Sequence, residues 1–244
     1  EEDIGSGMGM TAEKLAEQYS SPREEQDEFA LISQKRAAHA QESGRFAEEI
    51  VAVEVPSRKG TVIVDQDEHI KGEVTQEKLA SLKPSFLKDG TVTAGNASGI
   101  NDGAASVIIA SGEAVEKHEL KPLAKIISWG IAGVDPSIMG IGPVPAIKQA
   151  LARAEMTLEE IDLIEVNEAF ASQYLAVEKE LGLDRDKTNV NGGAIALGHP
   201  VGASGTRVFL SLAYELKRRG LKYGVASLCI GGGQGIAVII ENVN

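Results

Sequence analysis

Residues 11–44 carry apolar side chains at the spacing of a helix. Two helix starts lie inside this stretch, one near Thr11 and one at Ser21 and Pro22, where Ser21 is expected to be the cap and Pro22 the first helical residue. The pattern therefore predicts two successive helices, the second ending near Gly44.

An extended pattern follows these helices. β-Branched residues alternate over residues 50–64 on both sides of a turn at 57–60, which predicts two short strands. Residues 65–92 are polar, contain several lysines and show little periodicity. We expect them to form a long surface excursion, and long ordered loops are often functional.

From residue 93 onward, strand and helix patterns alternate. A loop of small residues at 93–103 leads into an apolar run, Ala104–Ala110, which predicts a strand. The alternation predicts an α/β sheet with helices on both faces, and the short link between the last two strands predicts an antiparallel hairpin. The remaining strands are expected over Ala124–Ser128, Ile161–Val166, Gly224–Ile230 and Gly235–Glu241, and the helices over Val144–Ala154, Ala169–Leu181 and Ala203–Arg219.

The composition agrees with a layered α/β protein. Hydrophobic residues make up 43% of the 244 residues and charged residues 25%, which is typical of globular proteins. The length suits one large domain or two small ones. Because aromatic residues make up only 4%, Ala, Val, Ile and Leu must fill the core, as they do around buried parallel strands.

The charge and the cysteine count exclude several classes of function. With 24 Lys and Arg against 36 Asp and Glu, the net charge is −12, which opposes non-specific binding to nucleic acid or to an anionic membrane. The single cysteine, Cys229, excludes an intramolecular disulfide and a multi-cysteine zinc site, and it favours a reducing, cytoplasmic location. No apolar run is long enough to cross a membrane. Because the first residue is Glu1 rather than Met, we expect a removed segment or a processed N-terminus.

A glycine-rich segment, residues 191–205, surrounds His199. Its glycines let the backbone turn sharply and approach a ligand closely, and the helix that follows places free N–H groups nearby. The Gly-Lys-Ser/Thr of a phosphate-binding loop is absent, so Walker-type nucleotide binding is rejected. A tight helix-entry turn with a surface histidine is the alternative interpretation.

Two further polar residues stand at expected strand ends. Cys229 ends an apolar strand and faces the glycine-rich hairpin 230–235, where backbone N–H groups can stabilise an oxyanion; a small core residue is the alternative. Asn167 follows a strand at the edge where open α/β sheets bind ligands. Asn167 can equally be a helix cap, and Glu168 a first-turn partner of the helix dipole. Together, a cysteine, a histidine and an asparagine so placed are the groups needed for thiol or proton chemistry with an oxyanion hole.

The motifs around these residues resemble those of the thiolases, the family of acetyl-CoA acetyltransferases and 3-ketoacyl-CoA thiolases. The resemblance covers nearly the whole chain, from about Met8 to the end. The motifs occur in the family's order and spacing at Gly95–Gly103, Met139–Pro143, Asn167–Phe170, Gly192–Gly202 and Cys229–Gly235.

The resemblance implies a thiolase-like layered αβαβα fold of class α/β, of which this chain is an incomplete copy matching the last three-fifths. Residues 1–100 are expected to be the remainder of a loop domain that binds CoA, residues 101–119 a strand and helix of the N-terminal half, and residues 120–244 the C-terminal thiolase domain. The family's acyl-accepting nucleophile is a second cysteine in the preceding part, so we expect this chain to be inactive or incomplete without that segment. Residues 1–7 look unlike the family, which usually has a histidine just before Met8.

The resemblance also assigns roles in a Claisen condensation and in its reverse, thiolysis. His199 matches the histidine that activates the nucleophile and helps to hold the thioester oxygen of acetyl-CoA. Cys229 matches the base that removes a proton from the acetyl methyl group or returns it. Asn167 matches the residue that holds a water in the oxyanion hole, where the enolate must be stabilised as charge develops. The backbone N–H of Gly231 matches a donor of a second oxyanion hole.

Further residues match positions that bind CoA and substrate. Ser98 matches a contact to pantetheine. Lys71 stands where the family often has an arginine near the CoA nucleotide, so the charge is kept but the planar fork is lost. Met139 matches the acyl end of the channel. The remaining matched positions along or near that channel are Phe86, Ala94, Phe170 and Met8.

The leading interpretation is an acyl-CoA C-acyltransferase of the acetyl-CoA C-acetyltransferase type, which joins two acetyl-CoA into acetoacetyl-CoA or reverses that reaction. Coenzyme A and acetyl-CoA are then substrates, and we expect no metal and no permanently bound cofactor.

The alternatives are a non-catalytic CoA-binding or assembly module and a thiolase for medium or long 3-ketoacyl chains. Because an incomplete fold leaves apolar surface exposed, we expect a homo-oligomer, either a dimer or a tetramer, or a partner chain carrying the N-terminal half.

Overall fold

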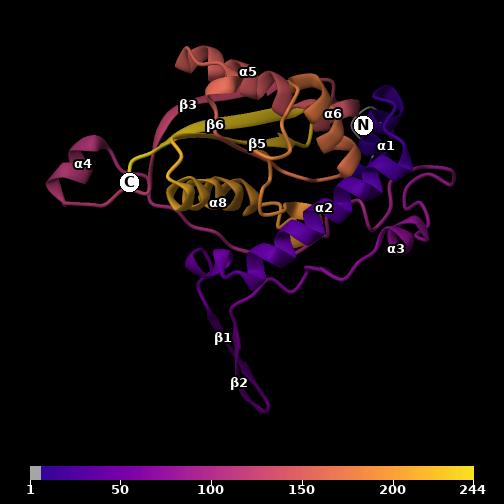
Figure 1. The fold of residues 1–244 in the computed structure, drawn as a ribbon, viewed down its shortest axis with the longest axis horizontal. Coiled ribbons are helices and arrows are strands. Elements are labelled where there is room, and N and C mark those ends of the chain that lie inside the picture. The colour runs from indigo at the N-terminus through magenta and orange to yellow at the C-terminus, as the bar shows by residue number, and fades with distance from the viewer. Residues whose placement is uncertain (1–6) are drawn as a thin grey trace.

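A mixed sheet forms the centre of the protein (Figure 1). The structure is a computed structural model that describes residues 7–244. Most of the stretch expected to differ from the family, residues 1–6, lies outside the described residues. Within the described part, β6 is antiparallel to both of its neighbours, β3 and β5, whereas β5 and β4 run parallel. The predicted hairpin of the last two strands is thus confirmed. The sheet order is β3 (Ala124–Gly133), β6 (Gln234–Asn242), β5 (Tyr223–Ile230) and β4 (Leu163–Val166).

Helices cover both faces of this sheet, as predicted. α5 (Pro143–Ala154) packs on one face with α6 (Ala171–Leu181) beside it, and α8 (Ser204–Arg219) packs on the other (Figure 1). Successive side chains of a strand point to opposite faces. Accordingly, Ile164 of β4 joins the apolar cluster of α5 and α6, whereas its neighbour Leu163 joins the cluster of α8.

Two N-terminal helices lie against α6. α1 (Met8–Gln18) packs on it directly, and α2 (Arg23–Glu42) crosses both α6 and the glycine-rich segment. The rings of Phe29 in α2 and Tyr174 in α6 stack with their centroids 4.0 Å apart. Pro22 is at the cap of α2, so this helix begins one residue later than predicted, a shift within the usual fraying of helix ends. Neither α2 nor any other helix within residues 7–244 has the length and apolar character to span a membrane.

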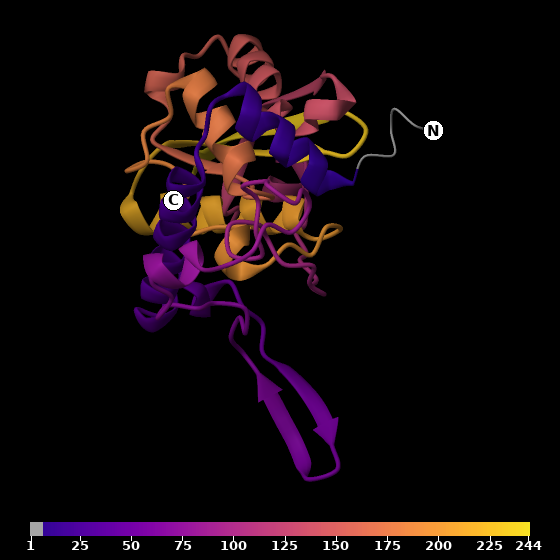
Figure 2. The same cartoon turned by 90° about the vertical axis from the view of Figure 1, so that its right-hand side faces the viewer.

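The predicted hairpin near residue 57 projects from the body of the protein (Figures 1 and 2). Its strands β1 (Val53–Ser57) and β2 (Gly60–Val64) are antiparallel, and their side chains are almost all exposed. Residues 65–92 are largely irregular, as predicted.

The short helices are η1 (Arg45–Glu48), α3 (Gln76–Ala80), α4 (Gly112–Lys117), η2 (Pro136–Ile141), η3 (Leu158–Glu160) and α7 (Ala194–Leu197).

The strand predicted over Ala104–Ala110 is wrong. These residues form no strand, because no other strand among the described residues lies beside them to exchange backbone hydrogen bonds. Apolar and β-branched side chains favour a strand, but only a neighbour can satisfy its N–H and C=O groups. The segment instead leaves Ile108 and Ile109 exposed, at 91% and 67%.

β3 is longer than predicted and forms an edge of the sheet. It pairs with β6 as far as Gly133, beyond the predicted end at Ser128, with a bulge between Ile126 and Ser128. On one face of this edge strand Trp129 and Ile131 are exposed, each at 54%. Apolar side chains therefore remain uncovered on that face of the sheet, as expected for a fold that meets further protein there.

Candidate active site

Asn167 lies directly after β4, where the parallel strands end. Its backbone N–H donates to the carbonyl of Ser227 in β5 at 3.0 Å, and its amide Nδ2 lies 3.4 Å from Nε2 of His199. Its Oδ1 is buried and has no hydrogen-bond partner among the described residues. Phe170 is the cap of α6, so Asn167 is not a helix cap. Because an unpaired buried acceptor is costly, this oxygen is suited to bind a water or a ligand.

Glu168 fixes the glycine-rich segment to the rest of the protein. Its carboxylate accepts hydrogen bonds from Ser33 Oγ in α2 at 2.6 Å and from Asn189 Nδ2 at 2.9 Å. Ser33 Oγ in turn accepts the backbone N–H of Gly193 at 3.1 Å. Burial raises the pKa of the Glu168 carboxyl, and these hydrogen bonds oppose the rise. Glu168 is 1% exposed, so it is an internal anchor, and the surface role beside the helix dipole is wrong.

The glycine-rich segment packs so closely on α2 that its path requires glycine. Gly192 has a φ of +77°, and a Cβ there would lie 2.5 Å from the backbone oxygen of Ser33. Gly198, directly before His199, has a φ of +89°. Residues with a side chain rarely adopt such angles. The two glycines therefore determine how the chain reaches the histidine.

His199 is held by its backbone and by one ring nitrogen. Its backbone N–H is shared between the carbonyl of Gly99 and Oδ1 of Asn101, each at 3.2 Å. Its Nδ1 lies 2.6 Å from Oγ of Ser204, which is fully buried. Burial lowers the pKa of His199, and the Arg207 guanidinium lowers it further. The imidazole is therefore neutral at pH 7, with Nε2 directed to the asparagine amide.

Cys229 lies near the end of β5, on the strand beside β4. It is half-buried and pairs in register with Gly235 of β6. Burial raises the pKa of the Cys229 thiol to about 12, so the group is protonated at neutral pH. Gly231 follows in the exposed turn of the hairpin, with open space beside its Cα. Cys229 packs against a buried apolar cluster made of Ala12, Val92, Ala97, Ala169 and Phe170.

The loop of small residues connects the turn after β4 to the histidine. The backbone N–H of Ser98 donates to the carbonyl of Ala169 at 3.0 Å, and the next residue, Gly99, accepts the N–H of His199. Consecutive residues of this loop thus contact both motifs. The structure therefore brings Ser98, Asn167 and His199 into one region, at the ends of the parallel strands.

An aromatic pair borders this region. The rings of Phe86 and Phe170 meet edge to face, with centroids 6.1 Å apart. Phe170 is 9% exposed and Phe86 45%, so one face of the pair is open to solvent. Met139 is buried in η2, whereas Met8 and Ala94 are exposed. Phe86 and Phe170 are thus brought together, and the channel roles of the other three residues stay predictions.

Lys71 reaches the site only indirectly. Its side chain is exposed, and its backbone N–H donates to Oε1 of Gln34 in α2 at 2.7 Å. Nε2 of the same glutamine donates to the carbonyl of Ile195, in the glycine-rich segment, at 3.3 Å. Gln34 thus fixes the lysine backbone relative to the histidine loop, while the ammonium group extends to solvent.

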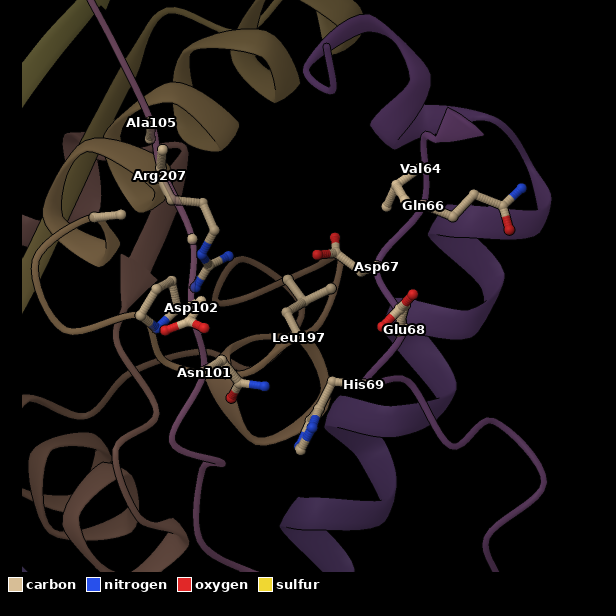
Figure 3. A pocket seen from close by; sticks show the side chains of 14 residues that line it. Val64, Gln66, Asp67, Glu68, His69, Asn101, Asp102, Ala105, Leu197 and Arg207 are labelled. Carbon is tan, nitrogen blue, oxygen red and sulfur yellow. The ribbon is translucent and has the colours of Figure 1, made fainter. Parts of the chain in front are cut away.

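A polar cavity of about 310 Å³ lies beside the histidine loop (Figure 3). Nε and Nη2 of Arg207 are buried there without hydrogen-bond partners among the described residues. The cavity is also lined by Asp67, whose pKa is raised by burial, and by Asn101. Asn167, His199 and Cys229 are not among its lining residues.

The sequence pattern assigned no role to Ser204, Asn101 or Arg207. Ser204 and Asn101 lie inside the motifs described above. The contact of Ser204 with His199 depends on the turn between them, and that of Asn101 depends on how two separate segments fold together. The one available signal was the presence of polar side chains in otherwise small-residue motifs.

Comparison with known proteins identifies the family of the chain. Residues 120–242 match the family model "Thiolase, C-terminal domain", and residues 3–113 match "Thiolase, N-terminal domain". The chain is 58% identical over 235 residues to human mitochondrial 3-ketoacyl-CoA thiolase, covering 96% of this chain and 59% of that protein. It is 54% identical over 239 residues to acetyl-CoA acetyltransferase of Rhizobium meliloti (strain 1021), covering 98% and 61%. The chain thus spans about three-fifths of the length of these relatives.

Solved structures show the same similarity in three dimensions. The crystal structure of human mitochondrial 3-ketoacyl-CoA thiolase matches with a TM-score of 0.97 and 56% identity, covering 100% of this chain and 62% of that one. The Bacillus anthracis acetyl-CoA acetyltransferase matches with a TM-score of 0.95 and 56% identity, covering 97% and 60%. The layered α/β fold expected from the sequence is therefore confirmed, and the chain belongs to the thiolase family.

Proposed function

We propose that this chain carries the proton-transfer and oxyanion-binding groups of an acyl-CoA C-acyltransferase of the acetyl-CoA acetyltransferase type. The observation that carries the proposal is the approach of Asn167 Nδ2 to His199 Nε2 at 3.4 Å, next to the strand end that bears Cys229. Polar groups converging where parallel strands end are the usual arrangement of a ligand site in an α/β sheet. Family membership supports the same reaction, as do relatives named 3-ketoacyl-CoA thiolase and acetyl-CoA acetyltransferase.

Cys229 is suited to move a proton at the carbon next to a thioester. In the cleavage direction its S–H bond breaks and a C–H bond forms on the enolate of acetyl-CoA, which leaves a thiolate. In the condensation direction that thiolate takes the proton, and the electron pair moves onto the thioester oxygen. With a pKa of about 12, the resting thiol is ready to donate, and only about 10⁻⁴ of it is ionised at pH 8.

Asn167 and His199 are suited to hold the enolate oxygen. A buried, neutral histidine can donate from Nε2, and the unpaired Oδ1 of Asn167 can orient a water beside it. Donors fixed before the charge develops stabilise it with little reorganisation. In this proposal Ser98 contacts the pantetheine arm, and the exposed ammonium of Lys71 meets the negative CoA nucleotide.

Exchange of the methyl protons of acetyl-CoA tests this function. Incubated with the 244-residue chain in deuterated buffer, acetyl-CoA should gain deuterium faster than in buffer alone, because proton removal and return both occur at Cys229. The rate should rise about tenfold per pH unit between pH 7 and 9, as the thiolate fraction rises. Cys229→Ala should abolish the enzymatic exchange. Exchange equal to that in buffer, or exchange unaffected by Cys229→Ala, would refute the proposal.

A preference for longer acyl chains is the second candidate. It is favoured by the half-exposed Phe86 beside Phe170, since an open aromatic pair can accommodate an apolar tail. Relatives of both substrate names match at similar identity. Both candidates predict exchange on acetyl-CoA, because cleavage of a longer 3-ketoacyl chain also releases the enolate of acetyl-CoA. Comparing how strongly acetoacetyl-CoA and a medium-chain 3-ketoacyl-CoA inhibit that exchange distinguishes the two. Binding of CoA with no exchange on acetyl-CoA would indicate the non-catalytic module instead.

We also propose that the chain associates with further protein, as a homo-oligomer or with a chain carrying the N-terminal half. The exposed Trp129 and Ile131 on the edge strand and the exposed Ile108 support this, because such surface promotes pairing. The single cysteine supports a reducing compartment, and a cytoplasmic location stays a prediction. A monomer at all concentrations in sedimentation would contradict the assembly proposal.

A further inference from the structure

A short relay of polar groups leads away from the rear nitrogen of the histidine. Nδ1 of His199 lies 2.6 Å from Oγ of Ser204, and that oxygen lies 3.0 Å from the carbonyl of Pro200. Ser204 is fully buried, so bulk water cannot replace its hydroxyl. Both groups belong to the start of α8 and to the turn before it, which fixes their positions relative to the ring.

The hydroxyl has one hydrogen and two possible acceptors for it. When the neutral imidazole carries its proton on Nε2, Nδ1 is an acceptor and the Ser204 O–H can donate to it. When Nδ1 carries a proton, the same O–H can rotate to Pro200 and the oxygen then accepts from Nδ1. The Pro200 carbonyl also accepts the backbone N–H groups of Ala203 and Ser204, at 2.8 and 2.9 Å. It is therefore satisfied in either state, and the rotation leaves no group unpaired.

The function proposed for His199 needs both states. To hold a thioester oxygen, Nε2 must carry a proton, whereas to activate a nucleophile it must accept one, which leaves the ring doubly protonated. A fixed donor or a fixed acceptor at Nδ1 would favour one of these states and oppose the other. A hydroxyl between a ring nitrogen and a carbonyl can serve both.

We propose that Ser204 is a positioning residue whose hydroxyl reverses its hydrogen bond to His199 as the ring gains and loses its proton. This inference rests on the proposed function of His199. The hydrogen bonds of Ser204 from which it is argued are present in the structure whatever that function is. Among charged groups, Arg207 on α8 acts on the pKa of the ring. The cavity that Arg207 lines also carries Asp67, His69 and Asp102. Among the described residues, none of these charged groups forms a hydrogen bond with Nδ1 of His199, whose partner is Oγ of Ser204.

Nitrogen NMR of the histidine ring tests the relay directly, without need of catalysis. With the four histidines labelled with ¹⁵N and His199 assigned by a His199→Asn variant, the titration reports both the pKa and the tautomer. Ser204→Ala should lower the pKa of His199 by about one unit. The reason is that a hydrogen bond to the charged ring is worth about 1.4 kcal/mol more than one to the neutral ring, which corresponds to about one pKa unit. The Nε2-protonated tautomer should also lose population, because its Nδ1 would lack a donor.

Two further variants separate the relay from a merely structural role. Ser204→Thr keeps the hydroxyl and should restore the pKa and the tautomer of the wild type. Thr206→Ala, in the same turn of α8, should leave both unchanged. A His199 titration in Ser204→Ala equal to that of the wild type would overturn the relay, even if acetyl-CoA exchange is observed. If the NMR shifts occur without any exchange, the proposed function fails and the relay stands.

Discussion

The pH dependence of protein stability tests whether the carboxyl of Glu165, in the strand that precedes the site, is buried. This carboxyl lies in β4, two residues before Asn167, and is 6% exposed. Burial raises its pKa to about 8; Arg207 opposes the rise, and Glu168 adds to it. In the unfolded chain the pKa is close to 4.5.

The direction of the pH effect follows from these two values. Between about pH 4.5 and pH 8 the folded protein holds a proton on Glu165 that the unfolded chain has released. Stability therefore falls as the pH rises through this window. A shift of about 3.5 units corresponds to at most about 5 kcal/mol, since one unit is about 1.4 kcal/mol. Below pH 4.5 this contribution vanishes.

The variant Glu165→Gln removes the titrating group and keeps the side-chain shape. Urea unfolding at pH 5, 7 and 9 should show the variant close to the wild type at pH 5 and clearly more stable at pH 9. The exposed Glu159→Gln is the matched control and should follow the wild type at every pH. If the wild type and Glu165→Gln lose stability equally between pH 5 and 9, the burial assigned to this carboxyl is wrong.

Three further variants test other parts of the structure. Gly192→Ala should destabilise the fold by about 2 kcal/mol or more in urea, because the residue has a positive φ and faces the Ser33 carbonyl; an unchanged midpoint would contradict this. Glu168→Gln places an amide opposite the hydroxyl donor of Ser33 and should lower the free energy of unfolding by about 1–3 kcal/mol. A urea midpoint equal to that of Glu159→Gln would show that the anchor is unimportant. Ile108→Lys should weaken concentration-dependent association in sedimentation without changing the midpoint, since the side chain is 91% exposed, and undiminished association would exclude this surface.

The elements that could be predicted from the sequence are those whose cause is local. α5 and α8 carry apolar faces at helical spacing, and the last two strands are joined by a short glycine turn, so each is visible in a few neighbouring residues. The run at 104–110 has the same local signal but no neighbouring strand among the described residues, so the prediction failed there. Gly130 and Gly133 interrupt the pattern of β3, which explains why its second half was missed.

The site was predictable as a set of residue types but not as a geometry. The pairing of Asn167 with His199 could be expected because both follow motifs at one end of the sheet. The anchoring of Glu168 by Ser33 joins residues 135 positions apart, and no local pattern indicates it. The contact of Ser204 with the histidine depends on the tight turn between them, whose shape the sequence alone does not specify.

Alkylation of Cys229 by a CoA-linked reagent tests the central claim, that this thiol faces a bound acyl thioester. Cys229 is the only cysteine of the chain, so intact mass reports a single event, and its raised pKa makes it slow toward untethered reagents. The account predicts that bromoacetyl-CoA modifies Cys229 at least about tenfold faster than iodoacetamide at equal concentration. This ratio corresponds to a lowering of the activation free energy by about 1.4 kcal/mol, because the bound CoA places the reactive carbon next to the thiol. Free CoA should suppress the reaction. Equal rates for the two reagents, or no protection by CoA, would contradict the account.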